Sequence, residues 1–314
     1  MKILLLGANG QLGRSFVEDG TLASLGEIVT ATRDGRRFDG LRSEAIDLAQ
    51  PDRLAGELDA LQPDVVINTA AYTAVDRAEQ EETLATTVNG HAVGILGRWA
   101  ASHGALVVHY STDYVFDGKA RTPYRPDAPT CPLGAYGRSK LAGERALMTS
   151  GAAHLIFRTA WVYAAHGRNF LRTMLRLGQE RDVLGVVGDQ IGTPTSTEVI
   201  VAGTLAALRR WCASTPDEQA SLQGIHHLVT RDHTSWHGFA SAIFDEATAR
   251  GVVDRPPHIH AITTADYPTP AQRPSWSVLD ARGMHDHFGF VAPSWREALQ
   301  PVVASLVDGR PGNN

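Results

Sequence analysis

The chain has 314 residues, of which 43% are hydrophobic, and a formal net charge of −5 with a sequence pI of about 6.2. This length and apolar content support a packed core of one large domain or two smaller ones, and exclude a disordered protein. The charge provides no basic surface for nucleic acid, and no apolar run approaches the length of a membrane span. Cys131 and Cys212 are too far apart for a disulfide framework or a zinc site, so we expect a reduced, cytoplasmic protein.

A short apolar strand and a glycine-rich turn open the chain. Residues 3–6 form a continuous apolar run, typical of a strand buried on both faces of a parallel sheet. Glycines then stand at positions 7, 10 and 13, ahead of a predicted helix. Glycine allows backbone to approach a phosphate, and the amides and dipole of the helix N-terminus attract a pyrophosphate. We therefore predict a dinucleotide-binding loop whose contact residues are Gly7, Asn9, Gly10, Gln11, Leu12 and Gly13.

The end of the second predicted strand, residues 27–32, should distinguish the two nicotinamide cofactors. An acidic residue there holds the ribose 2′-hydroxyl of NADH, whereas an arginine accommodates the 2′-phosphate of NADPH. Arg33 follows the strand directly, and Arg36 and Arg37 come close behind, while Asp34 keeps NADH open as the alternative. The sequence therefore favours NADPH.

Strands and helices alternate with short links through the first half of the chain. A buried strand over residues 64–68, a helix with Asn89, a strand through His109 and a helix with Tyr136 follow one another. This order predicts an α/β fold with a Rossmann-like, doubly wound parallel sheet, whose ligands lie at the carboxyl ends of the strands. Further cofactor contacts are expected from the segments that follow its strands, namely Asp47, Leu48, Ala70, Ala71 and Thr73.

Tyr136 and Lys140 stand four residues apart, so in a helix both side chains lie on one face. A lysine near a phenol favours the phenolate and lowers the tyrosine pKa, which would let Tyr136 exchange a proton near neutral pH. Residues 107–116 read as an apolar strand ending in hydroxyls, with Thr112 at its carboxyl end, facing the tyrosine. The pair alone also fits a solvated helix face, but the glycine-rich start of the chain favours a catalytic Thr112, Tyr136 and Lys140.

Beyond residue 160 the alternation becomes irregular. We expect a helix from about residue 167 to Glu180, a strand over residues 183–187, and a structured loop over residues 189–195 before another helix. Residues 254–274 are proline-rich with few helical signals, and the tail from residue 308 to 314 should be frayed. This predicts a nucleotide-binding domain over residues 1–160, to which residues 183–212 return, and an irregular substrate-binding lobe over residues 161–314.

Together these segments resemble the extended short-chain dehydrogenase/reductase superfamily and, within it, the dTDP-4-dehydrorhamnose reductase family. The glycine-rich loop and the Tyr136/Lys140 pair are common to the whole superfamily. The resemblance also includes residues 68–76, 109–116 and 136–144, and the more specific later stretches 158–163, 189–195, 227–229 and 267–274, so it covers almost the whole chain. It implies NAD(P)H-dependent reduction of the C4 keto group of dTDP-4-dehydro-L-rhamnose to dTDP-L-rhamnose, the last step of dTDP-rhamnose biosynthesis.

The resemblance also implies roles for single residues. Tyr136 would donate a proton to the C4 carbonyl oxygen, Lys140 would lower the pKa of that tyrosine and bind the nicotinamide ribose, and Thr112 would polarise the same carbonyl. Trp161 would lie against the sugar ring, although a tryptophan after a strand also fits core packing. The remaining substrate contacts would be Asp113 and Tyr114 in the sugar pocket, and Asn169 and Arg273 at the nucleotide and its diphosphate, where either could instead be a structural loop contact.

Two questions stay open in the sequence. Some family members hold Mg²⁺ between two subunits with glutamates, but Ser15 stands at one of those positions while Glu198 is retained, so we predict no metal site and a monomer or a homodimer. The function also has alternatives, namely a reductase of another nucleotide-linked keto-sugar or a non-catalytic NADP-binding regulatory subunit. Retention of Thr112, Tyr136 and Lys140 argues against the regulatory alternative, because binding alone needs no proton donor.

Overall fold

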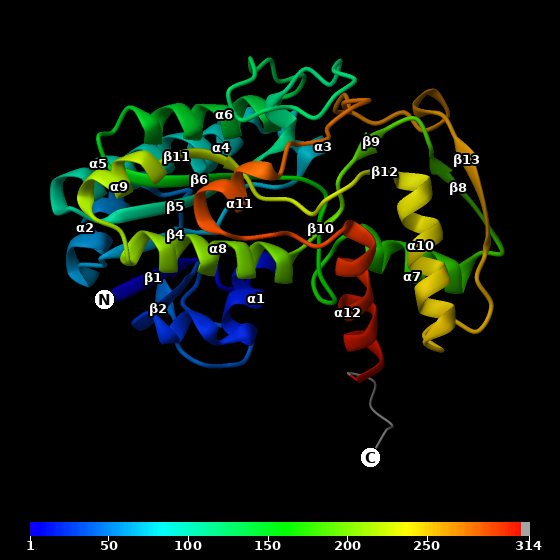
Figure 1. Cartoon of the computed structure of the whole chain (residues 1–314), viewed down its shortest axis with the longest axis horizontal. Helices are drawn as coiled ribbons and strands as arrows, with labels where there is room; N and C mark the ends of the chain where they lie inside the picture. The colour runs from blue at the N-terminus through cyan, green and yellow to red at the C-terminus, as the bar shows by residue number, and fades with distance from the viewer. Residues whose placement is uncertain (309–314) are drawn as a thin grey trace.

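The structure, a computed structural model, describes residues 1–308. Its central sheet has seven parallel strands in the order β11-β6-β5-β4-β1-β2-β3 (Figure 1). Their bounds are β1 Lys2–Leu6, β2 Glu27–Thr32, β3 Glu44–Ala45, β4 Val65–Asn68, β5 Leu106–Thr112, β6 Ala153–Thr159 and β11 Gly224–His227. The chain extends the sheet from β1 to β3 on one side, then from β4 to β11 on the other, which confirms the predicted doubly wound sheet.

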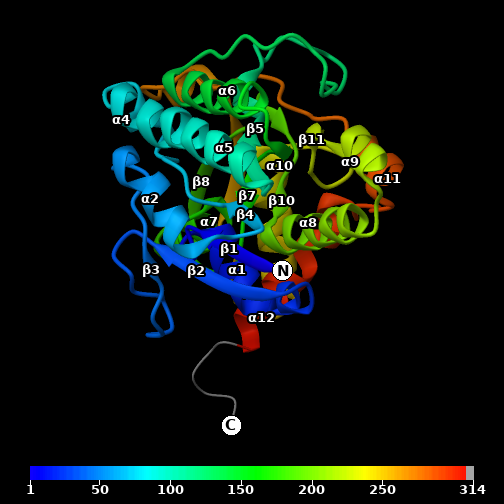
Figure 2. The same ribbon diagram turned by 90° about the vertical axis from the view of Figure 1, so that its left-hand side faces the viewer.

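Helices cover both faces of this sheet (Figure 2). One layer consists of α1 (Gln11–Asp19), α8 (Thr197–Cys212) and α11 (Arg282–Phe288), and the other of α2 (Pro51–Leu61), α5 (Ala92–His103) and α6 (Ala135–Met148). Neighbouring strand residues face opposite layers: Leu5 belongs to the apolar cluster of the first layer and Leu4 to that of the second. Burial on both faces therefore explains why the strands read as unbroken apolar runs.

Short helical segments connect these elements. They are the α-helices α3 (Val75–Ala78), α4 (Glu82–Thr86) and α9 (Pro216–Leu222), the π-helical turn η2 (Thr87–His91), and the 3₁₀ turns η1 (Thr21–Ser24), η3 (Asp113–Val115) and η4 (Thr264–Asp266). The expected helix around Asn89 is thus a π-helical turn between α4 and α5. The expected strand over residues 107–116 ends at Thr112 instead, because the Thr112 side chain caps the turn η3 that follows.

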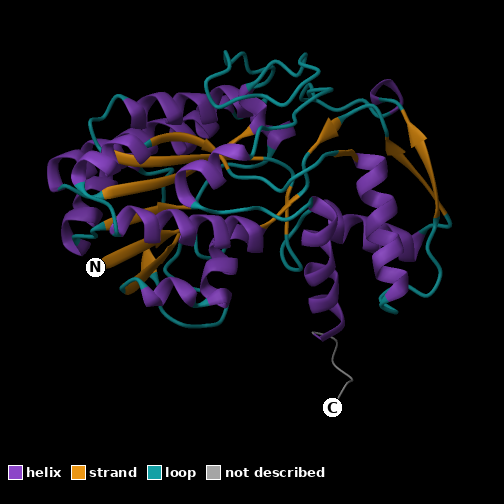
Figure 3. Ribbon diagram, viewed as in Figure 1, coloured by secondary structure: helices purple, strands orange, loops and turns teal. Residues whose placement is uncertain are grey.

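A smaller lobe lies beyond the carboxyl ends of the strands (Figure 3). It contains α7 (Phe170–Glu180), α10 (Trp236–Ala249) and α12 (Trp295–Asp308), and three two-stranded pairs: β8 (Val183–Val187) with β13 (His258–Ile262), β7 (Val162–Tyr163) with β10 (Thr195–Ser196), and β9 (Ile191–Gly192) with β12 (Thr234–Ser235). Its core includes Tyr163, Phe239 and Val303, all fully buried. No helix among residues 1–308 is both long and apolar enough to cross a membrane.

The chain passes between the sheet and the lobe several times. Within residues 183–212, α8 packs on α1, whereas β8 pairs with β13 outside the large sheet. β11, from a later segment, pairs with β6 at the sheet edge. The sequence did not indicate β13, because this strand lies in a two-stranded pair and leaves most of its side chains exposed or half-exposed. The division at residue 160 stays a prediction, and the tail beyond residue 308 lies outside the described residues.

Candidate active site

Thr112 ends β5 at the carboxyl edge of the sheet, as predicted. Its hydroxyl accepts a hydrogen bond from the Tyr114 amide (3.2 Å) and donates one to the Asp113 carboxylate (3.0 Å). Thr112 and Asp113 are only 5% and 2% exposed. The strand end and the turn after it therefore fix this hydroxyl in place.

Three contacts position α6 against β5. The Ala135 amide, at the helix N-terminus, donates to the Glu79 carboxylate (2.8 Å), and an acidic partner there also complements the helix dipole. The Asn89 side chain donates to the Ser139 hydroxyl (2.9 Å). Gly137 lies so close to the next segment that a Cβ atom would stand 2.2 Å from the Tyr114 carbonyl oxygen. The helix therefore approaches the strand end closely, with Tyr136 beside Thr112.

Tyr136 lies edge-on to Tyr114, with 5.7 Å between the ring centroids. Desolvation and then the Asp113 carboxylate raise the pKa of Tyr136 above its ordinary value, while a hydrogen bond with Thr112 acts in the opposite direction. The amino group of Lys140 is turned toward His109, and the expected lowering of the Tyr136 pKa by Lys140 stays a prediction. A phenol that keeps its proton suits a proton donor in the reductive direction.

Lys140 lies one turn after Tyr136 and is 2% exposed. Burial lowers the pKa of its amino group to about 8, and the Glu144 carboxylate opposes that shift. Glu144 itself forms a buried bidentate ion pair with Arg158 of β6, at 2.9 and 2.7 Å. This face of α6 is therefore held to the sheet by a charge pair as well as by packing.

Asp113 has one carboxylate oxygen without a partner in the described part of the chain. Its Oδ1 accepts from Thr112, whereas its buried Oδ2 has no hydrogen bond of good geometry, and the nearby hydroxyls of Ser277 and Thr112 only partly offset the desolvation of the carboxylate. Burial raises the pKa of this carboxyl to about 6. A sugar hydroxyl would supply the missing donor, which fits the predicted place of Asp113 in a sugar pocket.

The glycine-rich loop forms a cradle suited to a dinucleotide. Gly7 has a φ of +81°, and a Cβ atom there would stand 2.7 Å from the Ala70 amide nitrogen, so the loops after β1 and β4 touch through this glycine. No described side chain caps the N-terminus of α1, so its first-turn amides remain available to an anion. The predicted residues of both loops, Gly7 to Gly13 with Ala70 and Ala71, therefore meet at one place and fit a dinucleotide phosphate.

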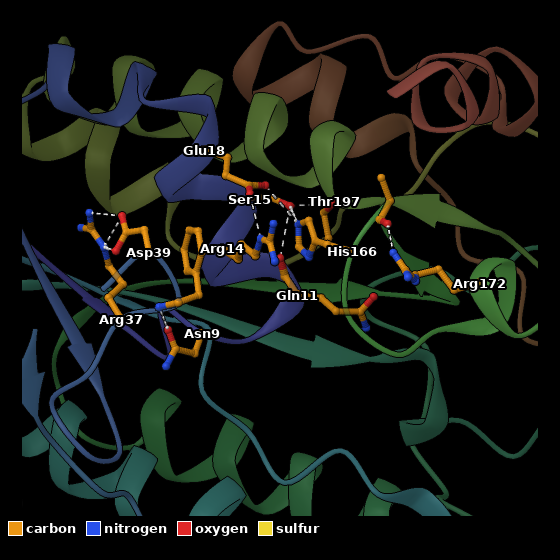
Figure 4. Close-up of polar contacts among 12 residues, drawn as sticks. Asn9, Gln11, Arg14, Ser15, Glu18, Arg37, Asp39, His166, Arg172 and Thr197 are labelled. Atoms are coloured by element: carbon orange, nitrogen blue, oxygen red, sulfur yellow. Dashed lines mark hydrogen bonds and ion pairs between the residues drawn. The ribbon is translucent and has the colours of Figure 1, made fainter. Parts of the chain in front are cut away.

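Asn9 organises the segment after β2 (Figure 4). Its side chain donates to the Arg36 carbonyl (2.7 Å) and accepts from the Phe38 amide (2.8 Å). Arg33 and Arg36 are exposed and have no ion pair within residues 1–308, whereas Arg37 pairs with Asp39. Two free guanidinium groups thus lie near the end of β2, where a 2′-phosphate would bind.

The carboxylates of Asp34 and Asp47 make hydrogen bonds within the chain. The Asp34 carboxylate accepts from the Arg36 amide (3.2 Å), and that of Asp47 accepts from the Ala49 amide (3.0 Å). Leu48 is 4% exposed and packs in the apolar cluster of the α2 layer, while Thr73 is exposed. Their contacts with a cofactor stay predictions.

Trp161, at the start of the lobe, has its ring stacked on that of Trp236. The Trp161 and Trp236 rings are parallel, with 3.4 Å between their centroids, and a side chain at position 192 would collide with the indole. Trp161 is half-buried and has a φ of +46°, a strained value for a residue other than glycine. Its position is therefore fixed by the lobe on one ring face.

Asn169 and Arg273 also make contacts within the chain. Asn169 caps α7 through the Arg172 amide (3.0 Å), and its amide group donates to Gln11 (2.8 Å). Arg273 donates to the Asp76 carboxylate (2.7 Å) and to the Tyr114 hydroxyl (3.1 Å). Arg273 thus contacts Tyr114, the aromatic neighbour of Tyr136. Asn169 instead connects the lobe to Gln11, in the glycine-rich loop.

The Ser15 hydroxyl makes its contacts within the chain. It lies 2.8 Å from that of Thr197 and 3.2 Å from a ring nitrogen of His166, a contact that joins α1 to the lobe (Figure 4). Among residues 1–308 there is no group of three or more His, Cys, Asp or Glu side chains that could hold a metal.

A separate hollow of about 830 Å³ is lined by Arg125, Arg231 and Phe290, among others, and by none of the predicted site residues.

Sequence reasoning assigned no role to three residues that the structure brings to the site. His109 contacts Lys140, Asn68 contacts His109, and Asp76 pairs with Arg273. A histidine and an asparagine within buried strand runs were a usable signal, because buried polar groups need partners. The Asp76–Arg273 pair spans 197 residues, and the sequence carries no local sign of it.

A dinucleotide cradle, with a threonine, a tyrosine and a lysine at the carboxyl edge of a doubly wound sheet, defines a reductase of the short-chain dehydrogenase type. The family model described as "RmlD substrate binding domain" matches residues 1–307. The chain belongs to this family.

Relatives across the full length agree with this assignment. The dTDP-4-dehydrorhamnose reductase of Burkholderia thailandensis is 46% identical, over 98% of this chain and 99% of that protein. The enzyme of the same name from Salmonella typhimurium is 40% identical, over 98% of both. A solved dTDP-4-dehydrorhamnose reductase from Clostridium acetobutylicum matches with a TM-score of 0.85 and 34% identity, over 98% of this chain and 100% of that one. That from Bacillus anthracis, in complex with NADP, has a TM-score of 0.84 and 29% identity, over 97% and 99%.

Proposed function

We propose that this chain reduces the C4 keto group of dTDP-4-dehydro-L-rhamnose to dTDP-L-rhamnose with NADPH. The observation that carries the proposal is the placement of Thr112, Tyr136 and Lys140 at one strand end, in a chain that is 46% identical over nearly its whole length to a reductase of that name. The two unpaired arginines after β2, Arg33 and Arg36, favour NADPH over NADH.

In this reaction a bound reduced nicotinamide supplies a hydride to the carbonyl carbon. Tyr136 gives its proton to the carbonyl oxygen as the oxygen gains negative charge, so the ketone becomes an alcohol. The Thr112 hydroxyl, whose single proton is directed at Asp113 in this structure, would turn that proton to the same oxygen and so stabilise the developing charge. Lys140 supplies a positive charge one helical turn from Tyr136 and a donor for the nicotinamide ribose.

Substrate binding falls to the turn after β5 and to the lobe. Asp113 offers its unpartnered oxygen to a sugar hydroxyl, and Tyr114 and Trp161 supply aromatic surface. Arg273 presents a guanidinium suited to the diphosphate. Asn169 could add a contact only by giving up a bond within the chain. The proposal includes a reduced, cytoplasmic setting, in keeping with two free, exposed cysteines.

The test is NADPH oxidation, and separately NADH oxidation, by the purified chain with dTDP-4-dehydro-L-rhamnose generated in place. Turnover with dTDP-L-rhamnose as the product would support the proposal. Turnover only with another nucleotide-linked keto-sugar would show that this other sugar is the substrate. Tight NADPH binding without turnover on any keto-sugar would contradict the reductase and favour a regulatory role.

A further inference from the structure

His109 lies inside β5, is fully buried and has no role in the reaction described above. Its neighbour in the sheet register is Asn68 of β4. The Nδ1 atom of the ring is 3.2 Å from the Asn68 side-chain nitrogen, and the Nε2 atom is 3.3 Å from the Lys140 amino group. Each ring nitrogen therefore meets one polar side chain, and one of these belongs to the catalytic group.

The direction of these contacts follows from the Ala70 amide. This N–H group can only donate, and it points at the Asn68 oxygen at 3.2 Å. The Asn68 nitrogen therefore faces His109 and donates to Nδ1. A neutral imidazole that accepts at one nitrogen carries its proton on the other, so the hydrogen-bond network assigns the proton to Nε2. Burial and the nearby Lys140 hold the pKa of His109 well below its ordinary value, so the ring is neutral.

The consequence falls on Lys140. An ammonium group has only donors and finds no acceptor in an Nε2–H group, whereas a neutral amine has a lone pair that can accept from it. Within residues 1–308 the amino group of Lys140 has no other hydrogen bond. Contact with His109 therefore favours the neutral amine.

The other charged or titratable groups near Lys140 come from three elements. Glu144, on the same helix, favours the ammonium, but Arg158 of β6 is paired with that carboxylate. Tyr136 lies one turn earlier on α6, beside Asp113 of η3. Burial lowers the pKa of Lys140 to about 8, and the contact with His109 acts in the same direction as burial.

We propose that His109 is a positioning residue that binds the neutral amine of Lys140 and, together with Asn68, sets the pH above which this lysine stops acting as a cation. The proposal rests on the proposed reductase function, since Lys140 matters there as a charge. It adds to that function an alkaline limit controlled by a residue that touches neither substrate nor cofactor.

His109→Gln tests the proposal, because a glutamine amide can turn its oxygen toward the ammonium. We expect the alkaline limb of the kcat profile to move upward by about one pH unit, a tenfold change in proton affinity, with kcat near neutral pH changed less than about threefold. His154→Gln is the matched control, since His154 is also buried, on β6, with its ring bonded to the Ala152 carbonyl (2.8 Å). An unmoved limb in His109→Gln, or an equal shift in both variants, would overturn the proposal.

A second measurement needs no catalysis. In a ¹⁵N spectrum of the histidine side chains, the ring signals lost in His109→Gln should show an unprotonated Nδ1 and a protonated Nε2. The opposite tautomer overturns the proposal even if the chain is an active reductase. If the chain shows the expected tautomer but no turnover, the proposed reductase function is contradicted and the assignment of the His109 proton is not.

Discussion

The chemical end and the recognition end of the candidate site are built differently. Thr112, Tyr136 and Lys140 come from one stretch of chain and are fixed by a strand end and a helix face. Trp161, Asn169 and Arg273 come from distant loops, and each already has a partner within the chain. The reactive groups are therefore held by secondary structure, whereas the recognition groups must keep or exchange internal contacts when substrate binds.

The largest expected effect concerns how firmly the chemical end is held. Glu144→Gln leaves Arg158 charged and buried, at 3% side-chain exposure, and should cost about 3–5 kcal/mol of unfolding free energy. The pair Arg176–Glu180 on α7 of the lobe is 60% and 50% exposed, so Glu180→Gln should cost less than about 1 kcal/mol. Urea unfolding of both variants measures the contrast. Equal losses would remove the distinction between the two regions.

A pH-dependent effect of up to about 3 kcal/mol follows from Asp113. Its pKa is raised from 3.8 to about 6 in the folded protein, so the unfolded chain loses this proton first and stability falls as the pH rises between those values. Asp113→Asn removes the titrating group. The unfolding free energy of this variant should therefore rise relative to that of the wild type between about pH 4 and about pH 7. Denaturant unfolding at several pH values checks this. A constant difference would show that the carboxylate ionises without penalty.

At the recognition end, Arg273→Ala should raise the KM for the dTDP-sugar by about tenfold, or about 1.4 kcal/mol, with little change in kcat. The reason is loss of a guanidinium from the diphosphate site. Asp76→Asn is the control, because it frees Arg273 from its ion pair without removing it. A KM that rises equally in both variants would make the pair a structural clamp and not a substrate contact.

The smallest effect is expected at Asn169. Asn169→Ala removes the side-chain cap of α7 and should cost about 1 kcal/mol of unfolding free energy. Since its polar atoms are occupied within the chain, the KM for the dTDP-sugar should change less than about threefold. Thermal unfolding measures the stability loss, and steady-state kinetics on the same sample measure the KM. A large KM change with unaltered stability would show that Asn169 contacts the substrate.

The sequence predicts the chemical end better than the recognition end for a physical reason. Gly7, Thr112 and the Tyr136/Lys140 pair occupy positions that local rules define, namely a turn, a strand end and one face of a helix. β2 and β8 also have the predicted bounds. These features depend on neighbours a few residues away.

Long-range contacts are where prediction from sequence fails. The ion pair of Asp76 with Arg273 and the stacking of Trp161 on Trp236 need the tertiary fold, and so does the pairing of β13 with β8. Helix spacing brings Lys140 near Tyr136 and so predicts a lower pKa for the tyrosine. The structure instead turns the lysine toward His109, a direction that spacing cannot specify.

The most direct test of this division is the single-turnover rate of NADPH oxidation at saturating dTDP-4-dehydro-L-rhamnose. Tyr136→Phe removes only the phenolic hydroxyl and should lower this rate by about 10³-fold, with NADPH affinity retained, while Arg273→Ala should keep a rate near that of the wild type. A wild-type rate in Tyr136→Phe, with the loss in Arg273→Ala instead, would contradict the account.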